Sequence, residues 1–180
     1  MCVYMTFLNI FGTGASALVV SKGLGGSLLT GILTAMYLLA GFLCGLVFET
    51  VDRFIRQYGF AFGIALSAAG LLLIASGTSA AVLAAGAVIG GFGMGYAFPA
   101  ALSLTITLTD PSSQTLAVSL VLSGSRVGMF LTTLVYLPLM TRAGFAIVMC
   151  YLVSGIVLLF LAAFCAVFLL IRSNLRNNTK

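Results

Sequence analysis

Residues 57–109 decide the fold: they read QYGFAFGIALSAAGLLLIASGTSAAVLAAGAVIGGFGMGYAFPAALSLTITLT and contain no charged side chain. A bilayer core of about 30 Å is crossed by roughly 20 helical residues, so this stretch is too long for one transmembrane helix. Gly77, Thr78 and Ser79 interrupt it with residues that favour a turn. The sequence therefore predicts two transmembrane helices, over residues 58–76 and 80–108, joined by a short loop.

Four more apolar intervals lie on either side of this stretch, over residues 1–20, 27–50, 113–139 and 144–171. Each is long enough to cross a bilayer as a helix. In the whole chain 62% of the residues are hydrophobic and 6% are charged, whereas about 25% are charged in an ordinary soluble domain. We therefore predict an all-α membrane protein with six transmembrane helices.

The charged residues predict the orientation of these helices. An even number of spans places both termini on one side, and cytoplasmic segments carry the excess of Lys and Arg. With the termini inside, only Lys22 and Arg142 lie outside, and the cytoplasmic residues are Arg53, Arg56, Arg172, Arg176 and Lys180. We expect an integral protein of the cell membrane with cytoplasmic termini and a basic tail, residues 172–180, at the lipid headgroups.

The composition disfavours several classes of function. The chain has no histidine, three acidic residues and four cysteines, so the usual general base and the usual zinc ligands are scarce. We expect no enzymatic activity, no catalytic residue, no metal and no cofactor, although a serine with a base other than histidine stays open. The basic residues are scattered, which disfavours a nucleic-acid partner.

The chain shows a weak internal repeat. At an offset of 85 residues, the segment Gly-Phe-Ala at 59–61 aligns with the same segment at 144–146, and Gly70 aligns with Gly155. We therefore predict two three-helix repeats, residues 1–76 and 80–171, within one bundle over 1–180. Because three is odd, the second repeat enters the membrane in the opposite orientation, as in many secondary transporters.

Polar residues follow one face on several of the predicted helices, since steps of three and four residues share a helix face. These are Thr6, Asn9, Thr13 and Ser16 in the first, Ser27, Thr30, Thr34 and Tyr37 in the second, and Thr115, Ser119, Ser123 and Arg126 in the fifth. The fourth is rich in glycine and carries Tyr96. These helices are expected to surround a polar pathway; alternatively, the hydroxyls bond to their own helix and the glycines permit close packing.

Arg126 lies near the centre of its predicted helix. An arginine at this depth costs about 2.5–3.5 kcal/mol on insertion scales, and no acidic residue of the chain lies at a similar depth. Its counter-charge is expected to be a substrate anion, a water-filled cavity or an acid on another polypeptide. The alternative is a structural arginine bonded to carbonyl groups of neighbouring helices.

Three local motifs resemble a known family. Residues 49–56, ETVDRFIR, are similar to the loop motif G-x-x-x-D-R-x-G-R of major facilitator superfamily transporters, although Phe48 and Ile55 replace the two glycines. Residues 91–99, GFGMGYAFP, and 125–128, SRVG, resemble the fourth and fifth helices of such a protein. The chain as a whole resembles the carboxy-terminal six-helix half of a member of this superfamily.

This resemblance implies a role and a missing partner. Members have twelve helices and hold the substrate between two halves, so the chain is expected to need a second six-helix half, either a separate chain or a second copy. It would then move a small organic solute by alternating access, with efflux and uptake both open. The expected pathway residues are Asn9, Thr13, Tyr37, Tyr96 and Arg126, and the expected cytoplasmic gate is Asp52, Arg53 and Arg56.

A second hypothesis comes from another class of function. The chain is then a membrane fragment or assembly subunit that transports nothing, and its polar faces bind partner helices. The lipid bilayer is a partner under both hypotheses, and a small-molecule solute only under the first.

Overall fold

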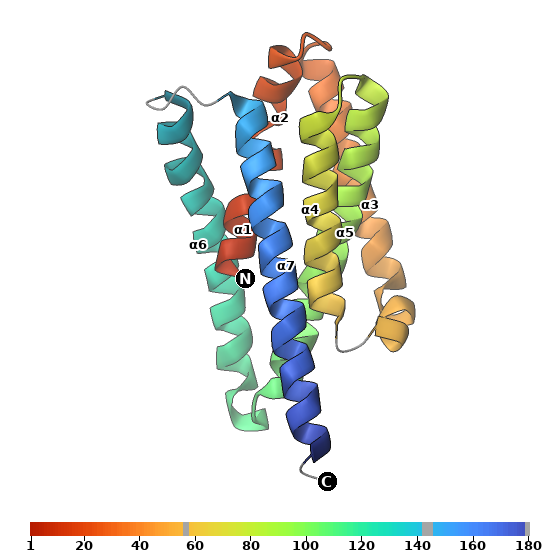
Figure 1. Cartoon of the computed structure of the whole chain (residues 1–180), viewed down its shortest axis with the longest axis vertical. Helices are drawn as coiled ribbons and strands as arrows, with labels where there is room; N and C mark the ends of the chain where they lie inside the picture. Colours follow the sequence, from red (N-terminus) through yellow and green to blue (C-terminus); the bar gives the residue numbers. More distant parts are fainter. Residues whose placement is uncertain (56–57, 142–145, 179–180) are drawn as a thin grey trace.

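The computed structural model describes residues 1–55, 58–141 and 146–178 (Figure 1). All regular elements within these ranges are helical: α1 (Cys2–Leu8), α2 (Ile10–Ser21), α3 (Ser27–Ile55), α4 (Gly59–Ser76), α5 (Ala80–Leu108), the 3₁₀ turn η1 (Pro111–Ser113), α6 (Gln114–Thr141) and α7 (Ile147–Asn178). With α1 and α2 taken together, the described residues form six helical segments long and apolar enough to cross a membrane. The predicted all-α fold with six transmembrane helices is confirmed.

Two features of the helices differ from the predicted spans. The first span is divided between α1 and α2 at a single residue, Asn9, whose backbone keeps right-handed helical angles (φ −68°, ψ −4°) and whose N–H still donates to the Met5 carbonyl oxygen at 3.0 Å. The last helix, α7, continues to Asn178 and so includes most of the predicted basic tail, residues 172–180. Between the third and fourth spans the predicted turn is present, and the Ser79 side chain caps the start of α5 by accepting a hydrogen bond from the Val82 N–H at 3.4 Å.

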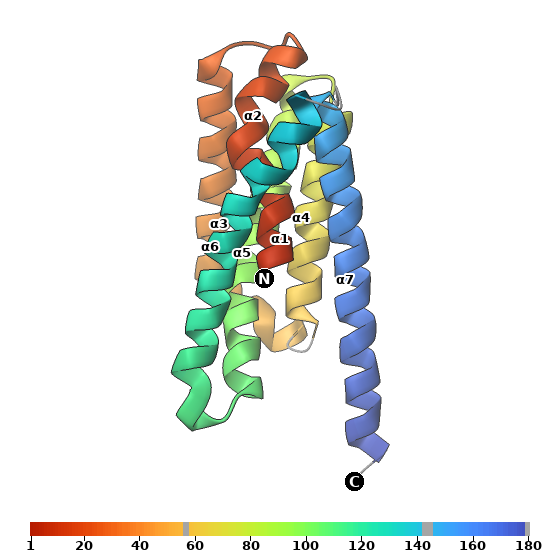
Figure 2. The same ribbon diagram turned by 90° about the vertical axis from the view of Figure 1, so that its left-hand side faces the viewer.

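The two sets of three spans start in opposite directions, while the inverted repeat itself stays a prediction. Figures 1 and 2 show α2, α4 and α6 running upward and α3, α5 and α7 running downward, so the second set of three spans starts in the opposite direction from the first. The helix α1 packs on α6, α3 packs on α5, and α4 packs on α7. In an inverted repeat, the first span corresponds to α5, α3 to α6, and α4 to α7. The pair of α1 with α6 then corresponds to the pair of α5 with α3, and the pair of α4 with α7 corresponds to itself. The exact repeat boundaries, 1–76 and 80–171, stay a prediction.

Glycines of α5 allow two neighbouring helices to approach its backbone. A Cβ atom at Gly93 would collide with the backbone of Ser67 in α4, and one at Gly91 would collide with the carbonyl group of Tyr37 in α3. Since the colliding atoms belong to backbone, they cannot move aside as a flexible side chain would. These positions therefore act in helix packing, as the alternative interpretation of the glycine-rich sequence predicted.

Buried tyrosines connect helices through their hydroxyl groups. The Tyr4 hydroxyl lies 2.8 Å from Ser67 Oγ, which joins α1 to α4, and Tyr151 donates to the Ile10 carbonyl oxygen at 3.2 Å, which joins α7 to α2. A third pair, Tyr136 and Ser154, joins α6 to α7. Each ring packs in the apolar core while its polar end finds a partner, so these contacts fix the helices that surround the interrupted first span.

Candidate functional site

The first span is interrupted at Asn9, and side chains from two other helices bind its backbone there. Thr132 of α6 donates to the Thr6 carbonyl oxygen at 2.9 Å, before the interruption. Tyr151 of α7 donates to the Ile10 carbonyl oxygen just after it. The Asn9 side chain itself reaches across, and its Nδ2 donates to the Met129 carbonyl oxygen at 3.4 Å. These contacts connect the backbone on either side of Asn9 to α6 and α7.

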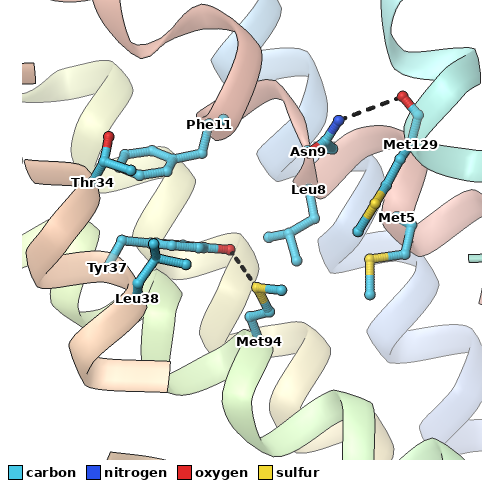
Figure 3. Close-up of a pocket in the computed structure, with 10 residues that line it drawn as sticks. Met5, Leu8, Asn9, Phe11, Thr34, Tyr37, Leu38, Met94 and Met129 are labelled. Atoms are coloured by element: carbon cyan, nitrogen blue, oxygen red, sulfur yellow. Dashed lines mark hydrogen bonds between the residues drawn. The ribbon is translucent and has the colours of Figure 1, made fainter. Parts of the chain in front are cut away.

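A pocket of about 140 Å³ lies directly beside this interruption (Figure 3). Its walls come from α1 and α2 around the interruption, and from α3, α5 and α6. These are the same spans whose polar faces predicted a shared pathway, whereas α4 and α7 contribute none of the lining. The lining residues are Met5, Leu8, Asn9, Phe11, Gly12, Thr34, Tyr37, Leu38, Met94 and Met129.

The pocket is apolar and aromatic in character, and none of its lining residues is charged. Phe11 stacks on Tyr37 with a centroid distance of 4.5 Å and an interplanar angle of 26°. The Tyr37 hydroxyl donates to Met94 Sδ at 3.2 Å, so this hydroxyl points along the wall of the pocket toward α5 (Figure 3). An uncharged ligand therefore fits this pocket better than an ionised one, since a charge there would lose its water without gaining an opposite charge.

The structure places two of the five predicted pathway residues in the lining of this pocket, and a third, Thr13, directly follows a lining residue. Asn9 and Tyr37 line it. Thr13 follows the lining residue Gly12 in α2 and is exposed, and its hydroxyl donates to the Asn9 carbonyl oxygen at 3.2 Å. Arg126 lies on α6 one turn before the lining residue Met129, on the same face of that helix, and is also exposed.

Arg126 forms no hydrogen bond or ion pair with any residue in the described part of the chain. The alternative in which carbonyl groups of neighbouring helices bind this arginine is therefore not seen within the described ranges. Thr115, Ser119 and Ser123 of the same predicted face are exposed as well. The polar face of α6 thus points outward from the six-helix unit, and any partner of Arg126 must lie outside the described residues.

Tyr96 lies apart from the pocket. Its side chain is 1% exposed, and its hydroxyl donates to Asp52 Oδ1 at 3.3 Å. Phe48 and Phe62 pack against its ring, with centroid distances of 5.1 and 5.8 Å. The structure therefore brings a predicted pathway residue, Tyr96, together with a predicted gate residue, Asp52, at the end of α3.

The other two predicted gate residues are Arg53 and Arg56. Arg53 lies near the end of α3, beside Asp52 in the sequence. Arg56 lies outside the described residues, and so does Arg142, which was expected on the outer side. Within the described residues, the predicted gate is thus represented by the hydrogen bond between Tyr96 and Asp52.

Several hydroxyls of the predicted polar faces bond to a backbone carbonyl oxygen four residues earlier in the chain. Thr6 donates to the Cys2 carbonyl oxygen, Thr34 to that of Thr30 and Ser119 to that of Thr115, all four residues earlier in the same helix. This is the local bonding that the alternative interpretation predicted for single hydroxyls. The polar character of the pocket itself therefore depends on Asn9 rather than on serine and threonine hydroxyls.

Lys22 makes a contact that the sequence analysis did not anticipate. The helix α2 ends at Ser21, with Lys22 as its C-cap, because Gly23 adopts the left-handed conformation (φ 63°), with hydrogen bonds from Gly23 N to Val20 O and from Leu24 N to Val19 O. The Lys22 ammonium group then donates to the Ile74 and Ala75 carbonyl oxygens, at 2.9 and 2.8 Å, and to that of Gly77. Burial lowers the pKa of this ammonium group, while its position suits the negative end of the α4 dipole.

The described residues contain no group of three or more His, Cys, Asp or Glu side chains that could hold a metal ion. All four cysteines are free thiols. The candidate site is the pocket at Asn9, with Thr13 next to its lining residue Gly12.

Comparisons with known proteins agree with this arrangement. The sequence pattern of the Major Facilitator Superfamily matches residues 1–180. No curated protein and no solved structure gives a significant match to the chain.

Proposed function

The chain belongs to the Major Facilitator Superfamily, and we propose that it forms one six-helix half of a secondary transporter that moves a small organic solute by alternating access. The family match establishes a transporter-type fold in an integral membrane protein. The half-transporter role, the solute and the mechanism belong to the proposal.

The observation that carries this proposal is the pocket beside the interruption at Asn9. Transporters place substrate sites near the bilayer midplane, at the interface between their repeats. Here the interrupted first span, α3, α5 and α6 surround a cavity of about 140 Å³. Asn9 and Tyr37 would contact the solute inside this cavity, and Thr13 would contact it at the exposed side.

Arg126 supports a second wall to the pathway. It is exposed on α6, and an arginine facing hydrocarbon is costly, so such residues face a bundle interior or a water-filled cavity. In the proposal, a second six-helix half, from another chain or a second copy, covers this face. Arg126 then lies in the enclosed pathway and pairs with an anionic group of the solute or with an acid of the other half.

The contact between Tyr96 and Asp52 supports a gate at the cytoplasmic end. In the proposal both termini are cytoplasmic and the membrane is that of the cell. Asp52, Arg53 and Arg56 form contacts in one state and release them in the other. The hydroxyl of Tyr96 accompanies this gate, since it donates to Asp52 at 3.3 Å, and Tyr96 then acts on the pathway through Asp52.

Solute flux into proteoliposomes tests the proposal. The chain is reconstituted alone and with a complementary six-helix half, and uptake of a panel of radiolabelled organic anions and neutral solutes is measured. We expect flux only in the presence of the second half or of a dimer of the chain. The variant Arg126→Ala should lower flux of an anionic solute by about ten- to a hundredfold, the value of one charged hydrogen bond. Arg126→Lys, which keeps the charge, is the matched control. Unchanged flux and stability in Arg126→Ala would contradict the role given to this residue.

The absence of any partner for Arg126 in the described ranges also favours a second candidate function. The chain would then be an assembly subunit whose exposed polar face binds helices of another protein without transport. Chemical cross-linking in the native membrane separates the two candidates. A carrier half is recovered in a twelve-helix particle of fixed stoichiometry, whereas an assembly subunit is recovered with a partner that is not a second six-helix half.

A further inference from the structure

The pocket at the interrupted first span has the size of one aromatic ring. Its volume is about 140 Å³ and it opens to the surface; an enclosed apolar cavity of similar volume, about 150 Å³, binds benzene. The lining contains no charged side chain and is dominated by methionine, leucine and aromatic residues. The pocket is therefore large enough for a ring but too small for a whole solute with a ring and an extended polar part.

The walls favour an aromatic ring over a saturated one. Met5, Met94 and Met129 contribute three thioether groups to the lining, and contacts between sulfur and an aromatic ring contribute about 0.3–1.5 kcal/mol. Phe11 and Tyr37 form a stacked aromatic pair on another side of the same pocket (Figure 3). A ligand ring can pack by its edge or face against this pair.

One polar group remains available to such a ligand. Asn9 uses its Nδ2 to donate to Met129, whereas its Oδ1 accepts no hydrogen bond from any residue that the structure describes. Gly12 leaves this oxygen accessible, because a Cβ atom at Gly12 would lie only 3.3 Å from it. An N–H or O–H group on the ligand would supply the donor that Asn9 Oδ1 lacks.

We propose that this pocket binds an uncharged aromatic ring that carries an N–H or O–H donor, such as an indole or phenol group of the transported solute. This inference rests on the proposed transport function and specifies the substrate class of the same site. The rest of the solute extends out of the pocket past the exposed residues Gly12 and Thr13.

Binding of indole to the detergent-solubilised full-length chain tests the proposal without requiring transport. The chain contains no tryptophan, so indole fluorescence reports the probe alone. We expect saturable binding with one indole per chain. Binding of 1-methylindole, which lacks the donor, should be about twofold to tenfold weaker, the range that one neutral hydrogen bond supplies. Phenol should displace indole at about twofold to tenfold lower concentration than cyclohexanol, because only phenol offers a ring to the methionine sulfurs.

Two matched variants locate the bound probe. Gly12→Leu places a side chain at the pocket and covers Asn9 Oδ1, so it should weaken indole binding by at least about tenfold, since a filled cavity cannot hold the ring. Gly45→Leu makes the same change on α3, where a Cβ atom meets nothing within 4 Å, and should bind indole as the unmodified chain does. The comparison of indole with 1-methylindole needs no variant and remains decisive if Gly12→Leu does not fold.

Each remaining outcome decides against the inference. Equal binding to Gly12→Leu and Gly45→Leu would assign the probe to the micelle or another surface. Release of the probe on addition of the second half would show that a side chain of that partner occupies the pocket in the assembly. These failures differ from failure of the proposed function, in which indole binds as expected but no solute crosses the membrane in the flux experiment.

Discussion

Replacing Gly93 with alanine is expected to push α4 away from α5. The added Cβ atom would lie 2.8 Å from the Cα atom of Ser67 and closer still to its backbone nitrogen. Carbon atoms in contact lie about 3.5–4.0 Å apart, so α4 must retreat by roughly 0.7–1.2 Å at this point. Ser67 also lies 2.8 Å from the Tyr4 hydroxyl, and the movement therefore disturbs the contact between α4 and α1 as well.

The expected size of the effect follows from these contacts. An extra carbon atom in a well-packed interior costs typically about 1–3 kcal/mol, and at Gly93 the neighbouring atoms are backbone. This cost is opposed by a stabilisation of about 0.5–1 kcal/mol, which is gained when alanine replaces glycine inside a helix. At Gly45, where nothing lies within 4 Å of the new Cβ atom, only the gain remains. The same substitution should therefore destabilise at one position and stabilise at the other.

Thermal unfolding of the two variants in one detergent measures the difference. The unfolding midpoint changes by about 2–4 °C for each kcal/mol in a chain of this size. The midpoint of Gly93→Ala is expected below that of the unmodified chain, and the midpoint of Gly45→Ala at or above it. Equal midpoints for the two variants would refute the close approach of α4 and α5 and the role of Gly93 in it.

Three further substitutions test single contacts, each by the free energy of unfolding in detergent. Lys22→Met removes the donors to the end of α4 and should lower the free energy of unfolding by about 1.5–3 kcal/mol. Lys22→Gln keeps N–H donors without the charge and should recover part of this loss. An unchanged stability in Lys22→Met would contradict the contact. Tyr96→Phe removes the hydrogen bond to Asp52 and should cost about 0.5–1.5 kcal/mol, and a cost that persists in the Asp52→Ala background would show that the hydroxyl acts elsewhere. Thr132→Val leaves the Thr6 carbonyl oxygen without its partner from α6 and should lower the free energy of unfolding by about 1–3 kcal/mol. Thr132→Ser keeps the hydroxyl and should retain most of the stability. An equal loss in both variants would show that packing, and not the hydrogen bond, is responsible.

The spans could be predicted from the sequence because lipid imposes a simple rule on it. Backbone polar groups need internal partners in the bilayer, so long apolar intervals form helices. The predicted boundary between the third and fourth spans, at Gly77, Thr78 and Ser79, agrees with the end of α4 at Ser76 and the start of α5 at Ala80. The division of the first span at Asn9 was not predicted, because the hydroxyls that bind the carbonyl oxygens of Thr6 and Ile10 on either side of it come from Thr132 and Tyr151, which are distant in the sequence.

The site could be predicted in outline but not in its contacts. The polar face of the first span indicated Asn9, and the pocket contains it. The spacing of α5 does not reveal that Tyr96 points to Asp52 while Met94, two residues earlier, faces the pocket. Lys22 was missed because a basic residue after a span is typical of a loop, although Lys-Gly at a helix end is a recognisable signal for a terminated helix.

The central claim is that the exposed face around the pocket is wetted inside the assembly and does not face lipid. It can be tested by modifying single cysteines, placed in a background without the four native ones, with a charged thiol reagent in membranes that contain the intact assembly. Thr13→Cys lies on this face, and Phe160→Cys lies on α7, where the native side chain is 73% exposed. Because a thiol reacts as its thiolate, we expect rapid modification at position 13 and little at position 160. Equal rates, or modification at position 160 alone, would contradict the account.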